Sequence, residues 1–191
     1  MTHLHTANLI RKYYQSFPAA HQLLLEHSRM VARKALSIAR RQLRREAIDI
    51  AFITEAAMLH DIGIIRTYAP DLHCSGESPY LAHGIIGHDI LQKEGLPHHA
   101  RVCERHTGVG LTAKEIIAQN LPLPIRDMRP ETIEEKIICY ADLFFSKNSR
   151  EHGQEKSPLE VRQGLIRYGG NKGEIFDNWQ RLFEPEQSAE G

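Results

Sequence analysis

The chain has 191 residues, of which 41% are hydrophobic and 25% charged, a composition typical of one folded domain and not of disordered or fibrous proteins. Its 24 basic and 24 acidic side chains cancel, which argues against binding a long nucleic acid or an anionic membrane. No apolar run approaches the ~20 residues of a membrane span, and the start lacks signal-peptide features, so we expect a cytoplasmic protein. Three separated cysteines predict neither a disulfide framework nor a zinc ribbon. The 12 histidines are the unusual feature of the composition.

Helical patterns recur along the chain, and no convincing strand pattern accompanies them. Apolar residues at three- and four-residue spacing predict a long amphipathic helix over residues 21–45. Residues 48–62 are apolar almost all round, which is typical of a central buried helix. Capping boxes at Thr112, Thr132 and Ser157 mark further helix starts. The other expected helices cover residues 80–93, 98–106, 113–119, 133–147, 159–168 and 173–183, with loops at 68–78, 107–110 and 121–130.

These elements predict an all-α protein. We expect a helical lead-in over residues 1–20, a single helical bundle over 21–147, and a short C-terminal helical extension over 148–191 that packs on the bundle. The polar stretch 146–157 would separate the last two parts.

The first candidate for chemistry is the pair His60 and Asp61 at the end of the buried helix. Burying an imidazole and a carboxylate in so apolar a context is costly unless they pair or ligate a metal. Alone, the dipeptide fits a capping pair equally well.

Two more polar residues lie on apolar helix faces. His27 lies on the apolar face of the first long helix, and Asp142 lies between Ile138 and Phe145 on a later one. Either residue alone is more often a satisfied core group than a ligand. Together with His60 and Asp61 they form a nitrogen and oxygen set suited to Mn, Fe or Zn and poorly suited to Ca.

The order of these residues resembles the HD-domain metal-dependent phosphohydrolases, whose pattern is H…HD…D. Residues 60–63 read His-Asp-Ile-Gly, which is the HDIG variety of that family. The resemblance covers roughly residues 23–147 and includes Leu-Glu-His-Ser at 25–28, His-Gly-Ile-Ile-Gly at 83–87, Glu-Arg-His-Thr-Gly at 104–108 and Glu-Lys-Ile-Ile-Cys-Tyr-Ala-Asp at 135–142. It implies a single HD-domain helical bundle.

The resemblance also implies a ligand set. A first divalent metal would be bound by His27, His60, Asp61 and Asp142. The segments around His83 and His106 are similar to a two-metal subgroup that includes symmetrical dinucleoside tetraphosphatases, in which these two histidines would hold a second ion and Asp61 would bridge. The expected cofactors are one or two divalent transition metals, Fe, Mn, Zn, Co or Ni, with Mg less favoured.

The implied activity is hydrolysis of a phosphoester or phosphoanhydride in a small nucleotide or other phosphorylated metabolite. Two ions ~3.5 to 4 Å apart would lower the pKa of a shared water and offset charge on the phosphoryl oxygens, with Asp61 as the catalytic carboxylate. Phosphomonoesterase, phosphodiesterase and pyrophosphohydrolase all remain open. The expected loop at 68–78 is longer than in the dinucleoside tetraphosphatases, which weakens that particular comparison.

Basic residues near the motifs are candidates for binding a substrate phosphate. Arg66 follows the HDIG motif, and Arg105 and Lys147 are weaker candidates of the same kind. The alternative for Arg66 is an ordinary surface arginine. No P-loop or dinucleotide-binding glycine pattern is present, so a bound nucleotide would be a substrate and not an energy source.

A second class of function stays open alongside the enzyme. The metal site could bind a nucleotide without cleaving it, and the C-terminal helices could report that binding to a partner. In either case we expect a small phosphorylated ligand, no long nucleic acid and no membrane, and a homodimer stays open.

Overall fold

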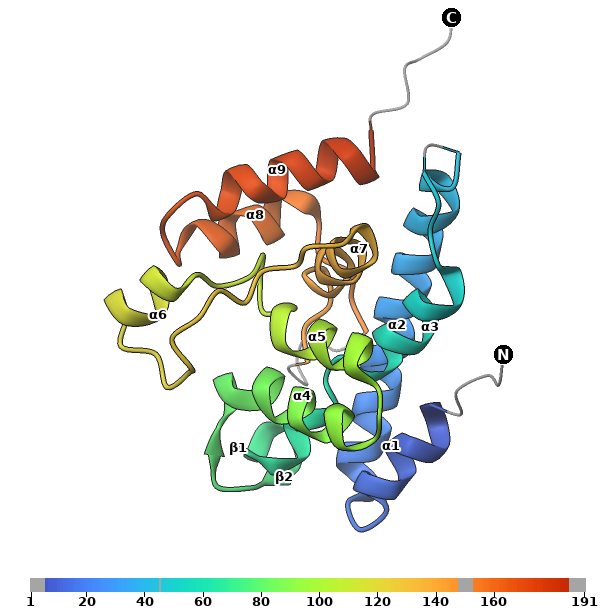
Figure 1. Ribbon diagram of the computed structural model, residues 1–191, viewed down its shortest axis with the longest axis vertical. Helices are drawn as coiled ribbons and strands as arrows, with labels where there is room; N and C mark the ends of the chain where they lie inside the picture. Colours follow the sequence, from blue (N-terminus) through green and yellow to red (C-terminus); the bar gives the residue numbers. More distant parts are fainter. Residues whose placement is uncertain (1–5, 45, 148–152, 186–191) are drawn as a thin grey trace, which may run out of the picture.

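The computed structural model describes residues 6–44, 46–147 and 153–185 (Figure 1). Helices dominate these ranges, which confirms the all-α prediction. They are α1 (Thr6–Tyr14), α2 (Pro18–Gln42), α3 (Ile50–Leu59), α4 (His83–Lys93), α5 (Pro97–Arg105), α6 (Ala113–Ala118), α7 (Ile133–Asp142), α8 (Pro158–Ile166) and α9 (Lys172–Phe183). Three short 3-10 turns join them, η1 (Ile62–Arg66), η2 (Pro70–Leu72) and η3 (Tyr80–Ala82).

A small sheet lies where the sequence predicted a loop without strands, and that prediction is wrong. Its strands are β1 (Thr67–Ala69), β2 (Cys74–Ser75) and β3 (Ser78–Pro79), in the order β2-β1-β3. β1 pairs antiparallel with β2 and parallel with β3, in the register Tyr68 to Ser75 and Thr67 to Ser78. Strands of two or three residues are too short to show an alternating pattern, so no strand could be predicted here from the sequence.

Several helices end earlier than their apolar patterns predicted. α3 stops at Leu59 and the chain continues as the tighter turn η1, while α7 stops at Asp142 and not at Lys147. The apolar pattern continues past both helices, because residues 60–65 after α3 are buried and residues 143–147 after α7 are buried or half-buried. The capping boxes at Thr112 and Ser157 are complete, whereas Thr132 accepts from Glu135 N and Glu135 turns its carboxylate to the backbone N–H of Glu131.

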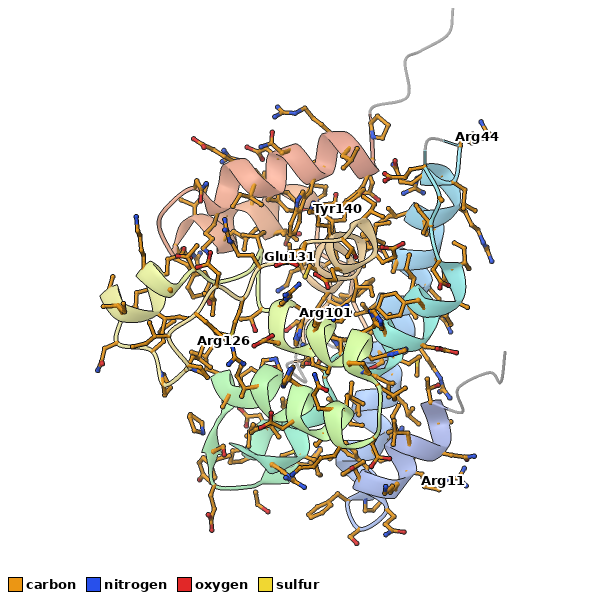
Figure 2. All side chains as sticks on the ribbon, viewed as in Figure 1. Arg11, Arg44, Arg101, Arg126, Glu131 and Tyr140 are labelled. Carbon is orange, nitrogen blue, oxygen red and sulfur yellow. The ribbon has the colours of Figure 1, made fainter. Side chains whose placement is uncertain are left out.

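The core has two parts that meet at α3. One part is built by α2, α3, α7 and the C-terminal helices, and the other by α1, η1, α4 and α5. In the first part Tyr140 of α7 lies between helices (Figure 2), and its ring stacks on Phe176 of α9 with the ring centroids 5.5 Å apart. α8 and α9 lie together along one side of the bundle (Figure 1). The first residues of the expected extension, 148–152, lie outside the described ranges.

No helix in the described ranges combines the length and the apolar character that crossing a membrane requires.

Candidate metal centre

Six side chains that the sequence singled out meet in one buried site. α2 carries His27 in its middle, His60 and Asp61 follow the end of α3, and Asp142 is the last residue of α7. The other two are His83, the first residue of α4, and His106, which caps the end of α5. The imidazoles of all four histidines are almost fully excluded from solvent, at 0 to 4% exposure of the residue. The middle of α2, the start of α4 and the ends of α3, α5 and α7 thus meet at this site.

Three of the histidines are held in one tautomer by their own backbone. Nδ1 of His60, His83 and His106 lies 2.7 to 2.8 Å from the carbonyl oxygen three residues earlier. A carbonyl only accepts, so each Nδ1 carries a proton and donates it, which leaves Nε2 as the nitrogen that faces the site and can ligate. At the ends of α3 and α5 these carbonyls belong to the last helical turn, where carbonyl groups lack an intrahelical partner, so His60 and His106 cap the two helices.

The Nε2 atoms converge on the carboxylates in a first group of four ligands. His27 Nε2 lies 2.9 Å from Asp142 Oδ1 and 3.3 Å from Asp61 Oδ2. His60 Nε2 lies 3.1 Å from the same Asp61 oxygen and 3.3 Å from His27 Nε2. This group is the one that the resemblance implied for a first metal.

A second group uses the other oxygen of Asp61. His83 Nε2 and His106 Nε2 lie 3.4 and 3.3 Å from Asp61 Oδ1, and 3.1 Å from each other. Because Asp61 offers one oxygen to each group, it stands between them as a bridging carboxylate would.

The residues present fit divalent metal ions. In each group the potential ligand atoms all lie within 4.8 Å of one another. Ligands at about 2.1 Å from a shared ion in tetrahedral or octahedral geometry are themselves about 3.0 to 3.4 Å apart, which matches the distances above. Both oxygens of Asp61 and Oδ1 of Asp142 are buried, and their close contacts to imidazoles and to Lys147 lack good hydrogen-bond directions. A divalent cation would stabilise these buried carboxylates and the two imidazole nitrogens that face each other at 3.1 Å.

The charges of the site also favour a cation. Burial by itself would lower the pKa of His60, but the carboxylates of Asp61 and Asp142 outweigh burial and raise it to about 10. Burial lowers the pKa of His83 to about 4, so its imidazole is neutral at pH 7 and able to ligate. Burial disfavours the charged form of Asp61, yet His60 and Lys147 hold the pKa of this carboxyl well below its usual range.

Lys147 is the predicted substrate-binding residue that the structure brings into the site. Its Nζ lies 2.8 Å from Asp61 Oδ2 and 3.5 Å from Asp142 Oδ1, and its side chain is 13% exposed. Burial lowers its pKa, but the two carboxylates outweigh this and hold the pKa well above its usual value, so the ammonium stays charged.

The two arginines lie elsewhere. Arg66 is exposed on η1 and lies near Tyr13, and among the described residues no hydrogen bond or ion pair joins it to the candidate ligands. Arg105 Nη1 binds Glu131 at 2.9 Å and Glu135 at 3.2 Å. Since Glu135 is buried and bonded also to the Glu131 backbone at 2.6 Å, Arg105 is the counter-ion of a buried carboxylate at the end of α5.

Sequence reasoning missed two tyrosines. Tyr80 stacks on the His83 ring with centroids 4.8 Å apart and accompanies Lys147 in lining an open cavity of about 520 Å³. Its position three residues before His83, on the same helical face, is a signal that could have found it. Tyr14 of α1 accepts from the Ile65 backbone and donates to the Ile62 carbonyl, both at 3.1 Å, and so fixes the turn that follows Asp61. No sequence pattern marks that role.

The helical bundle and the buried His/Asp site together define a domain of the HD type. The HD domain family matches residues 24–145. Because this match covers more than half of the chain, the chain belongs to the HD-domain family of metal-dependent phosphohydrolases, as its HDIG motif predicted.

Two of the curated relatives are named for a different activity, and a third is named as uncharacterized. The chain is 41% identical over 99 residues to a tRNA (cytidine(56)-2'-O)-methyltransferase of Picrophilus torridus. This alignment covers 51% of this chain and 25% of that protein. A protein of the same name from Thermoplasma volcanium is 33% identical over 159 residues, 83% of this chain and 40% of that protein. Uncharacterized protein MJ0778 of Methanocaldococcus jannaschii is 34% identical over 119 residues, 61% of this chain and 63% of that protein. The chain thus spans between a quarter and just under two thirds of these relatives. No solved structure matches the chain.

Proposed function

We propose that the protein is a metal-dependent phosphohydrolase that cleaves a phosphoester or phosphoanhydride bond of a small phosphorylated molecule. The observation that carries this proposal is the pair of ligand groups that share Asp61, one with Oδ2 and one with Oδ1. The arrangement fits two divalent ions side by side, and Fe, Mn, Zn, Co and Ni are all compatible with imidazole and carboxylate ligands. When bound, such ions lower the pKa of a water molecule and offset negative charge on a phosphoryl group.

The chain's own residues perform the remaining tasks. The backbone carbonyls that accept from His60, His83 and His106 hold the imidazoles in position, so the site is preorganised before substrate arrives. Lys147 adds a fixed positive charge beside Asp61 and borders the open cavity with Tyr80. A phosphate that enters from this cavity meets the ammonium first, which supports the predicted role of Lys147 in substrate binding.

The methyltransferase name of the two archaeal relatives does not extend to this proposal. Their alignments cover 25% and 40% of those proteins, so most of each relative lies outside the segment shared with this chain. A buried set of four histidines and two aspartates suits metal-assisted hydrolysis. We therefore base the proposal on the site of this chain and not on the names of those relatives.

The direct test is phosphate release from nucleotides, dinucleotides and sugar phosphates. Metal-stripped protein is refilled with Mn or Fe, and the metal content of the sample is measured before the assay. We expect release of phosphate or a phosphorylated product from at least one compound. If two ions are bound and no compound is cleaved, while a nucleotide is retained intact, the site is a sensor and the proposal is wrong.

Replacing Lys147 by methionine tests the substrate-binding role. We expect kcat/KM to fall about 10²-fold, because one charged contact to the phosphoryl group is lost. Metal content is expected to stay the same or to rise, because the substitution removes the positive charge that lies beside the carboxylates of Asp61 and Asp142. Lys93→Met, at the exposed far end of α4, is the matched control and is expected to behave as the parent protein. An unchanged kcat/KM in Lys147→Met would remove this residue from substrate binding.

A further inference from the structure

A second cavity borders the metal centre on the side of His83. It measures about 500 Å³, within the range of ~300–1,000 Å³ typical of ligand pockets. His83 and Tyr80 form one end, and the turn that follows His106 forms another part of the wall. α8 also lines the cavity, together with Tyr168, which lies just beyond that helix. Lys172 of α9 binds Glu115 of α6 at 2.6 Å and so joins these two neighbouring helices beside the cavity (Figure 1).

The lining favours an apolar, planar ligand group. Apolar side chains make up much of the wall: Leu81, Val109, Leu111, Leu121, Leu143 and Leu165. Tyr80 and Tyr168 add aromatic faces at the rim, and such faces stack on planar rings. Two of the charged lining residues are engaged within the protein: Lys172 donates to the Gly110 carbonyl at 2.6 Å, and Glu160 accepts from the Ser157 backbone at 2.7 Å.

Gly164 is an independent sign that the space is kept open. It lies within α8, where a glycine costs about 1 kcal/mol relative to alanine. No protein atom lies within 4 Å of the position that a Cβ would take, so packing does not explain the glycine. Because Gly164 lines the cavity, a larger side chain there would project into it.

We propose that this cavity binds the planar aromatic ring of the phosphorylated substrate, a ring of the nucleobase type, while the phosphate lies at the metal centre. The inference rests on the proposed function and narrows its substrate class to phosphates that carry such a ring. It also assigns specificity to α8 and Tyr168, which lie beyond residues 24–145 of the HD match.

The binding test uses the full chain and the four common nucleosides, which carry the ring but no phosphate. Calorimetry on the metal-free protein should detect binding of at least one nucleoside. Gly164→Leu should weaken this binding at least about ten-fold by filling the cavity, and Tyr168→Ala should weaken it about ten-fold by removing a stacking face. Gln163→Leu adds the same side chain to the exposed face of α8 and should leave binding unchanged.

The kinetic test compares adenosine 5′-phosphate with ribose 5-phosphate, which differ only in the base. We expect the parent protein to prefer the compound with the base, and Gly164→Leu to lose that preference while it still cleaves ribose 5-phosphate at the parent rate. Measurable and equal rates for both compounds in parent and variant would overturn the inference and leave the proposed function standing. Nucleoside binding that responds to Gly164→Leu, in a protein that cleaves none of the nucleotides, dinucleotides and sugar phosphates of the direct test, would support the cavity and refute the hydrolase. A parent protein that binds no nucleoside and shows no preference for the base overturns the inference.

Discussion

Asp61→Asn is expected to abolish hydrolysis, with a fall in kcat of about 10³-fold or more, because metal-ion catalysis supplies several kcal/mol and each ~1.4 kcal/mol is a factor of ten. Asparagine keeps the shape of the side chain but replaces one charged oxygen by an N–H₂ donor, which cannot ligate. Since each oxygen of Asp61 belongs to a different ligand group, the loss affects both groups. Among the six candidate ligands, Asp61 alone belongs to both groups.

The measurement is metal content by mass spectrometry together with phosphate release. Asp61→Asn is expected to lose both ions, whereas His106→Gln removes a ligand from the second group only and is expected to retain the first ion. Thermal unfolding of the metal-free forms checks that each variant is folded. Full metal content in Asp61→Asn would contradict the shared-carboxylate arrangement, and loss of both ions in His106→Gln would contradict the separation into two groups.

Gly63→Ala is expected to lower the free energy of unfolding by about 3 kcal/mol, near the upper end of typical overpacking costs. A Cβ on Gly63 would lie 2.1 Å from the His83 carbonyl oxygen and 2.3 Å from the Gly87 backbone nitrogen. Both neighbours are backbone atoms of α4, so relief requires η1 and α4 to move apart. Because α4 begins at His83, that movement also displaces a metal ligand.

Urea unfolding of the metal-free protein measures this effect without a contribution from metal binding. Gly164→Ala is the matched control, because it adds the same methyl group inside a helix where no atom lies within 4 Å. It is expected to raise stability by up to about 1 kcal/mol. Equal stabilities of Gly63→Ala and the parent would show that the close contact between η1 and α4 is not required.

The parts of the fold that the sequence predicted are those with a local cause. The capping boxes at Thr112 and Ser157 predicted helix starts because the bonds lie within four residues. Motif order and polar residues on apolar faces predicted the six candidate ligands, and the structure brings these six side chains together. The sheet at 67–79 was not predicted, because its strands depend on pairing partners and not on a pattern of their own.

The residues around the ligands were harder to predict. Arg66 is close to the HDIG motif in sequence, but η1 directs it to the surface, whereas Lys147 returns to the site from beyond α7. Arg105 is adjacent to a ligand, yet buried Glu135 engages its guanidinium. In each case a long-range contact decides the outcome, and a single sequence does not reveal such contacts.

The position of Tyr14 bears on where this protein can be cut. A fragment trimmed to residues 24–145 would retain every metal ligand, so its sequence would still read as a complete HD domain. It would lack the hydroxyl that bridges Ile62 and Ile65, and also Lys147 and the helix that carries Gly164. Residues 24–145 would therefore contain the six candidate ligands without Tyr14, Lys147 and α8, the elements that position the turn after Asp61 and line the two cavities.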